Sequence, residues 1–291
     1  MQAEQAAQGG IRLLIRKYAR GGGLMLSAPA LLFLSLFFAF PTLLFLWRSV
    51  SEPQWGFGNY ATLLGDATYA RVLANTFLLA GIVTVLAIAI GYPVVWLITI
   101  VRPGTARLVL AILLLSMWTN LLARTYAWLV LLQRSGVVNM VLLRLGVISE
   151  PLALVNNLTG VVIGMTYIML PFAVLPLQAT LASIDPTLLQ AGAVCGAGPF
   201  TVFRRLLLPM SLPGIATAAV MIFVMSLGYY ITPSLLGGTG NMMVAELIAE
   251  QIQSFLNWGL GSAAAMVLLG AALLVYLLFV ALVERRTAIA E

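Results

Sequence analysis

The sequence predicts an all-α membrane protein with about six transmembrane helices. Its 291 residues are 62% hydrophobic and only 8% charged, and the mean hydropathy is +1.06. Soluble globular proteins of this size do not have such a composition. Six apolar stretches reach the length of roughly 20 helical residues that crosses a bilayer. Transmembrane strands would alternate in polarity at every second residue, and no segment does so.

The predicted spans form one membrane domain over residues 24–283, between a basic segment (1–23) and a short tail (284–291). The first apolar stretch is longer than the core of a signal peptide, so we expect it to remain as a span. Residues 10–20 predict a basic amphipathic helix, which suits either a membrane-surface helix or a flank that only fixes topology. The six spans are predicted at 24–47, 76–101, 108–132, 153–180, 211–236 and 261–283.

The connections and the prolines complete this outline. Arg102-Pro103-Gly104 predicts a tight turn. One outer connection contains a short apolar piece that is too short to span, Val137 to Leu145, and another contains a helix-like run, Met242 to Leu256. A proline inside a helix removes a hydrogen bond and can kink the helix, which membrane helices tolerate. Such prolines lie in or beside the spans at Pro41, Pro93, Pro171, Pro176, Pro213 and Pro233.

The positive charge collects on one side of the predicted membrane. The N-terminus, the 102–107 turn, the 181–210 connection and the C-terminus hold the whole net charge of +6, while the charges of the other side cancel. Because cytoplasmic loops carry the excess of Lys and Arg, both termini and the 181–210 connection are expected to be cytoplasmic. This distribution argues against a nucleic-acid partner.

The residue types exclude several kinds of chemistry. The chain has one cysteine, Cys195, and no histidine, so it lacks an internal disulfide, the usual soft metal ligands and the usual general base. It also lacks the Gly-x-x-x-x-Gly-Lys-Ser/Thr loop that binds nucleotide phosphates. We therefore expect no catalytic residue, no metal site and no cofactor in this chain.

The 181–210 connection, between the fourth and fifth spans, is the most informative part of the sequence. Asp185 is a good N-cap and Pro186 suits the first position of a helix that ends near Gly196. Pro199 opens a second predicted helix, Phe200 to Leu208, which leads to Pro209. Small side chains between the two helices favour a docking surface for a protein outside the membrane over a plain hairpin.

The spacing within this connection resembles the coupling loop of ABC importer permeases. That loop reads Glu-Ala-Ala, three residues, Gly, nine residues, then Ile-x-Leu-Pro. The corresponding residues here are Gln190-Ala191-Gly192, then Gly196, then Leu206 to Pro209, with the same intervals. Gln replaces Glu, Gly replaces the second Ala, and Leu replaces Ile. The exchange of Glu removes a carboxylate but leaves the small-residue surface.

Three other segments are similar to spermidine/putrescine-type permeases. They are Trp118 to Trp128 (WTNLLARTYAW), Gly91-Tyr92-Pro93, and Thr232 to Gly238 (TPSLLGG). The resemblance covers most of the chain from about residue 24 onward. The subgroup also includes permeases for opines, aminophosphonates and other small organic solutes.

The resemblance implies a multi-pass subunit of the bacterial inner membrane that is not itself an enzyme. Two permease subunits would form the pathway among the membrane lipids, and an ATPase dimer carrying ATP and Mg²⁺ would dock on the coupling loops. A periplasmic or lipid-anchored binding protein would deliver the solute. The residues implied in coupling are Asp185, Pro186, Gln190, Ala191, Gly192, Gly196, Arg204, Arg205 and Pro209.

The sequence offers fewer indications of the solute. Arg124 is the clear ionisable residue of a predicted span, about 25 Å above Arg107, and an anchor or an ion pair with an outer acid is favoured over a solute contact. A polyamine is the favoured solute, which aromatic faces could bind; an opine, an amino-acid-derived solute or a phosphonate is the alternative. Candidate pathway residues are Trp118, Arg124, Tyr126, Tyr167, Tyr229 and Tyr230.

Two other classes of membrane protein fit less well. A stand-alone carrier or channel would predict ionisable groups for ion coupling within the spans and a short inner connection. A membrane-embedded enzyme would need clustered His, Asp or Glu at membrane depth. The sequence predicts neither pattern.

Overall fold

The computed structural model describes the backbone of residues 23–290 and the side chains of residues 27–238 and 240–281. The predicted basic segment, including the amphipathic helix at 10–20, lies outside these residues except for Gly23. All regular secondary structure in the described part is helical, and six helices are long and apolar enough to cross a membrane. The predicted fold class is therefore confirmed.

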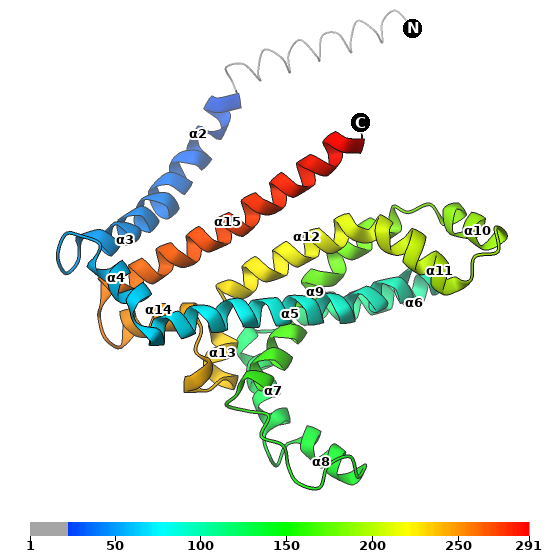
Figure 1. Ribbon diagram of the computed structural model, residues 1–291, viewed down its shortest axis with the longest axis horizontal. Coiled ribbons are helices and arrows are strands. Elements are labelled where there is room, and N and C mark those ends of the chain that lie inside the picture. Colours follow the sequence, from blue (N-terminus) through cyan, green and yellow to red (C-terminus); the bar gives the residue numbers. More distant parts are fainter. Residues whose placement is uncertain (1–22, 291) are drawn as a thin grey trace, which may run out of the picture.

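The helices follow one another from the N-terminal to the C-terminal end of the described chain (Figure 1). Their bounds are α2 (Gly23–Leu34), the π-helical turn η2 (Ser35–Ala39), α3 (Phe40–Ser51), α4 (Gly58–Gly65), α5 (Ala67–Ile100), α6 (Pro103–Trp118), α7 (Leu121–Leu132), α8 (Val137–Arg144), α9 (Leu158–Ala182), α10 (Pro186–Val194), α11 (Pro199–Val202), the π-helical turn η3 (Phe203–Leu207), α12 (Leu208–Leu227), α13 (Ile231–Leu236), the 3₁₀ turn η4 (Thr239–Asn241), α14 (Val244–Gln253) and α15 (Trp258–Ala290).

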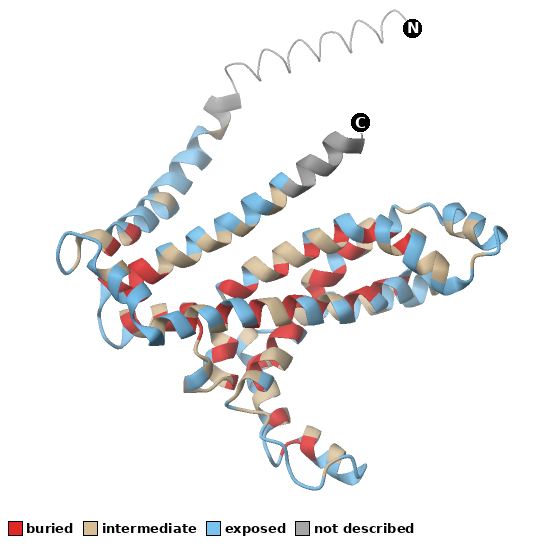
Figure 2. Cartoon of the chain, in the orientation of Figure 1, coloured by how far each residue is buried: buried red, intermediate tan, exposed pale blue. Residues whose placement is uncertain are grey.

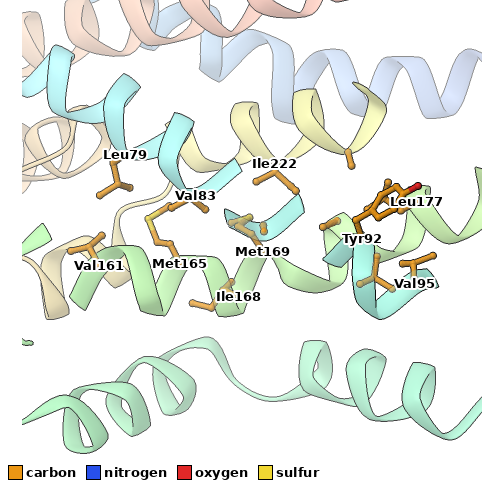
Figure 3. Packing of buried hydrophobic residues seen from close by; sticks show 14 of the residues in the cluster. Leu79, Val83, Tyr92, Val95, Val161, Met165, Ile168, Met169, Leu177 and Ile222 are labelled. Atoms are coloured by element: carbon orange, nitrogen blue, oxygen red, sulfur yellow. The ribbon is translucent and has the colours of Figure 1, made fainter. Parts of the chain in front are cut away.

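The centre of the molecule is a bundle of α5, α9 and α12, which holds the larger of two clusters of buried hydrophobic residues (Figure 2). Val83, Met165, Met169 and Ile222 meet between these three helices (Figure 3), and each is fully buried. Because lipid is as apolar as these side chains, close packing and dispersion stabilise the bundle more than exclusion from water does.

Small residues allow these helices to approach one another closely. A Cβ atom at Gly91 of α5 would lie 3.1 Å from Ala173 Cβ of α9. A Cβ atom at Gly214 of α12 would lie 2.7 Å from Thr180 Cβ of α9, which is closer than real side chains come. Glycine at position 214 is therefore a requirement of the α9–α12 contact.

The helices at the two ends of the chain diverge from this bundle. α15 packs against α3, and both extend away from the central helices (Figure 1). Along α2 and η2, Leu32, Phe33, Phe37 and Phe38 are each more than 60% exposed. Such a face suits contact with lipid or with another membrane subunit.

Two of the predicted spans are broken. The span predicted at 108–132 is α6 and α7, separated at Thr119-Asn120, where Asn120 Oδ1 accepts a hydrogen bond from the Leu122 N–H at 2.8 Å. The span predicted at 211–236 is α12 and α13, separated near Gly228. Continuous helices were therefore a wrong prediction, because asparagine favours the N-cap position and glycine the end of a helix.

The prediction for Pro209 was wrong in the opposite direction. The helix predicted at 200–208 does not stop before it, because α11, η3 and α12 form one uninterrupted helical run. The π-helical turn η3 ends two residues before Pro209, as η2 ends two residues before Pro41. A proline ring would clash with the carbonyl group four residues earlier, and the wider π turn relieves that clash.

The connections at 48–75, 133–152 and 237–260 contain more helix than predicted. α14 confirms the helix-like run at 242–256, whereas α8 and α4 are additions at 133–152 and 48–75. α14 is held against α5 because the Val244 N–H donates to Thr76 Oγ1 at 2.9 Å. α15 runs to Ala290, so most of the predicted tail continues the last helix.

Replacing Gly214 with leucine should separate α9 from α12. We expect the substitution to lower the free energy of unfolding by about 1–3 kcal/mol, the usual cost of overpacking, measured as a fall in the thermal denaturation midpoint in detergent. Gly81→Leu is the matched control, because a Cβ at Gly81 of α5 meets no atom within 4 Å. Equal midpoints for the two variants would contradict this account of the contact.

Candidate functional site

Residues 181–210, here called the coupling segment, project from one end of the bundle (Figure 1). α10 begins as predicted: Asp185 Oδ1 accepts a hydrogen bond from the Thr187 N–H at 2.9 Å, and Pro186 follows at the first helical position. Because the charged carboxylate is the better acceptor, this bond lowers the pKa of Asp185. Asp185 therefore fixes the start of the helix.

Gly196 fixes the end of α10. Its φ of +81° lies in the left-handed region, which glycine adopts without strain. The Ala197 N–H donates to the carbonyl oxygen of Gly192 at 3.1 Å, which closes the turn. A Cβ at Gly196 would meet no atom within 4 Å, so the backbone conformation explains this glycine.

Gly192 has a different role from the one predicted. A Cβ at this position would lie 2.8 Å from Leu206 Cδ1 and 3.5 Å from Val202 Cγ2. Its small size therefore allows α10 to pack against α11 and η3 within the coupling segment. The accessible surface consists instead of its exposed neighbours, namely Gln190, Ala191, Ala193 and Val194, with Phe200, Arg204, Arg205 and Pro209 on the second helix.

The exposed side of the coupling segment is apolar for a surface outside the bundle. Val194 is 88% exposed and Phe200 is 72% exposed, while Arg204 and Arg205 lie at the base of the segment. Exposed apolar side chains beside polar ones are typical of protein interaction sites. The arrangement can bind another protein.

A second candidate region lies where the two broken helices meet. Thr125 of α7 and Thr232 of α13 are both buried, and their hydroxyl oxygens are 3.3 Å apart. Arg124 precedes Thr125, and its positive charge interacts with the hydroxyl group of Tyr229 between α12 and α13. The structure thus brings two of the predicted pathway residues together.

Arg124 is not paired in the way that was expected. Its Nε atom is buried without a hydrogen-bond partner. Among the side chains that the structure describes, the salt bridge is Arg48–Glu52, in the outer part of the chain. Among these described side chains, Arg124 therefore forms no ion pair with an acidic residue.

Tyr167 of α9 pairs with a residue that the prediction missed. Its ring lies 5.5 Å from that of Trp128 in a T-shaped arrangement, and both line a groove of about 320 Å³ with Leu86 and Ile90 of α5. Trp128 lies one helical turn after Arg124, and this spacing was the available signal. Trp118, Tyr126 and Tyr230 are exposed and do not line this groove, so the six candidates do not form one site.

No group of three or more His, Cys, Asp or Glu within the described residues could hold a metal ion. The candidate site has two parts, namely the exposed apolar surface of the coupling segment and the groove lined by Trp128 and Tyr167.

Known proteins are similar to this chain in sequence and in fold. The profile of the family described as binding-protein-dependent transport system inner membrane component matches residues 24–289. The spermidine/putrescine transport system permease protein PotB of Haemophilus influenzae is 34% identical over 205 residues, or 70% of this chain and 71% of that protein. PotB of Escherichia coli K12 is 33% identical over 221 residues, or 75% and 80%.

Two solved structures have the same fold. A chain of the bacterial alginate ABC transporter, in complex with its alginate pentasaccharide-bound periplasmic protein, gives a TM-score of 0.76 at 20% identity and covers 94% of this chain and 98% of that chain. A chain of the inward-facing MetNI methionine ABC transporter gives 0.57 at 19% identity, covering 75% and 95%. With the match over residues 24–289, these findings show that the chain belongs to the family of binding-protein-dependent transport system inner membrane components, as a multi-pass permease subunit.

Proposed function

We propose that this chain forms the pathway of an ABC importer together with a second, homologous permease subunit. The pathway would switch its opening from one side of the membrane to the other as ATP is bound and hydrolysed by a partner. The observation that carries the proposal is the coupling segment. Its sequence keeps the spacing of the motif, and it folds into two helices outside the bundle. The exposed apolar face of α2 and η2 is a candidate contact for the second permease.

The partner that hydrolyses ATP is an ATPase dimer, which binds the coupling segment. ATP and Mg²⁺ belong to that dimer, because this chain has no phosphate-binding loop of the Gly-x-x-x-x-Gly-Lys-Ser/Thr type. Val194, Phe200 and the exposed small residues of α10 supply the contact, while Asp185 and Gly196 hold the helix in shape. This chain itself performs no catalysis.

The coupling segment and both termini face the cytoplasm in this proposal. Arg102, Arg107, Arg204 and Arg205 gather at that end of the bundle, as the preference of cytoplasmic loops for positive charge requires. The opposite end, with α4, α8 and α14, then faces the solute-binding protein outside the inner membrane.

A polyamine is the proposed solute. The names of the PotB relatives support it, and the rings of Trp128 and Tyr167 can attract an ammonium group through cation–π contacts. Glu246 and Glu250 on α14 place negative charge at the outer end, although burial raises the pKa of Glu246 and its neighbour Glu250 adds to this effect. When Glu246 is ionised, its carboxylate can accept hydrogen bonds from an ammonium group.

One observation favours a second class of solute. Arg124 has a buried Nε without a hydrogen-bond partner, and an anion that approaches a guanidinium group within a membrane span would stabilise it. An opine, an amino-acid-derived solute or a phosphonate would supply that anion.

ATP hydrolysis by the assembled transporter separates these possibilities. The chain should co-purify with an ATPase, and in nanodiscs with the binding protein its hydrolysis should rise on addition of spermidine or putrescine. Stimulation by an opine or a phosphonate alone would keep the machine and replace the solute. Failure of any ATPase to associate would contradict the role of the coupling segment.

Replacing Gly196 with alanine tests that segment more directly. A side chain in the left-handed conformation costs about 1–2 kcal/mol, so association with the ATPase should weaken by about 5–30-fold, measured by titration of the ATPase onto nanodiscs. Gly198→Ala is the control, because Gly198 has φ near −64° and open space around its Cβ position. Equal affinities for both variants would contradict the assigned role of Gly196.

The aromatic groove can be tested with a pair of variants. If the solute is an organic cation, Trp128→Leu should raise the KM for solute-stimulated hydrolysis by about 2–30-fold, the value of one cation–π contact. Tyr167→Phe keeps the ring and should leave KM close to that of the unmodified chain. An unchanged KM in Trp128→Leu would remove this groove from the pathway.

A further inference from the structure

A second groove, of about 550 Å³, lies where the coupling segment joins the bundle. It is bordered by the last turns of α5, the first turns of α6, the end of α9 and the membrane-facing side of α10. We call it the basal groove. Its walls are mainly apolar and include Trp96, Ile100, Ala106, Leu110, Leu181 and Leu189.

Arg107 also lines the basal groove and gives it a positive charge. Its Nε atom donates to the carbonyl oxygen of Pro103 at 3.3 Å, which ties the guanidinium group to the first turn of α6. No carboxylate lies within salt-bridge distance of Arg107 among the described side chains. The remaining N–H groups of the guanidinium can therefore bind an anion, ideally the oxygens of a phosphate.

The basal groove leaves α10 with little support on its membrane-facing side. A neighbouring hollow of about 320 Å³ shares Trp96, Leu189 and Leu207 with it, so apolar hollows lie on both sides of this contact. Apolar side chains that line an open groove gain dispersion contacts when a hydrocarbon chain lies against them. An occupant with a flexible hydrocarbon chain would supply these contacts and hold α10 in place.

We propose that the basal groove binds an anionic phospholipid, with an acyl chain between the apolar walls and the phosphate at Arg107. The charge of Arg107 and the apolar lining of the groove together match this ligand, since basic residues beside membrane helices select anionic headgroups. The lipid would belong to the cytoplasmic leaflet. Only this choice of leaflet rests on the proposed function, because the proposed orientation of the coupling segment defines which leaflet is cytoplasmic.

Quenching of tryptophan fluorescence by brominated lipids tests the site. The assembled transporter is placed in phosphatidylcholine nanodiscs that contain a small fraction of brominated phosphatidylglycerol or brominated phosphatidylcholine. The signal of Trp96 is obtained by subtracting that of the Trp96→Phe variant. We expect the anionic lipid to quench Trp96 at about fivefold lower fraction than the zwitterionic one, since one arginine near a membrane surface supplies an attraction of this size.

Four variants locate the interaction. Arg107→Gln should abolish the preference for the anionic lipid, and Arg107→Lys should keep most of it. Arg71→Gln is the matched control, because Arg71 lies near the opposite end of α5 from Trp96, and it should leave the preference unchanged. Ala106→Leu, which fills the basal groove, should reduce quenching by both lipids.

Two outcomes would overturn the proposal. Equal quenching by both brominated lipids would show that Arg107 selects no anion. Absence of Trp96 quenching by either lipid would show that protein covers the groove, as the second permease could. Selective quenching of Trp96 in a transporter whose ATP hydrolysis responds to no solute would contradict the proposed function while leaving the lipid site intact.

Discussion

Wherever a membrane helix is broken, backbone N–H and C=O groups lose their partners, and lipid cannot form hydrogen bonds with them. The rest of this structure depends on how the chain supplies partners for these groups. The break between α6 and α7 and the break between α12 and α13 lie together, joined by Thr125 and Thr232. Asn120 satisfies the first N–H groups of α7, and the Asn156 N–H donates to the carbonyl oxygen of Leu236 at the end of α13 at 2.8 Å. The contact between Thr125 and Thr232 thus holds α7 against α13 at this junction.

The coupling segment is connected to the bundle by two helices in close contact. α9 leads into it and α12 leads out of it, and Gly214 lets α12 lie directly against Thr180. Because the helical run from Pro199 to Leu227 has no interruption, a displacement of the coupling segment would act on the bundle as a rigid lever. Packing rather than a flexible hinge links the surface that binds another protein to the core.

Hydropathy predicted six spans because the thickness of the bilayer fixes the length of a spanning helix. It missed both breaks, since an average over a long window is insensitive to one asparagine or glycine. The rule that proline stops a helix failed at Pro209, where a π turn relieves the clash. In the coupling segment, Asp185, Pro186 and Gly196 were readable because capping is local. The pairing of Trp128 with Tyr167 was not, because it depends on how distant helices pack.

The unbroken helical run also restricts which changes of sequence this protein can accept. Each residue inserted into a helix rotates everything beyond it by about 100°, so one insertion between Gly196 and α12 would turn the coupling segment away from its present direction. Exchanges of side chains carry no such penalty. The nine residues between Gly196 and Leu206 match the interval of the coupling loop that this segment resembles, and we expect an insertion there to disturb the segment more than an exchange of the exposed Gln190.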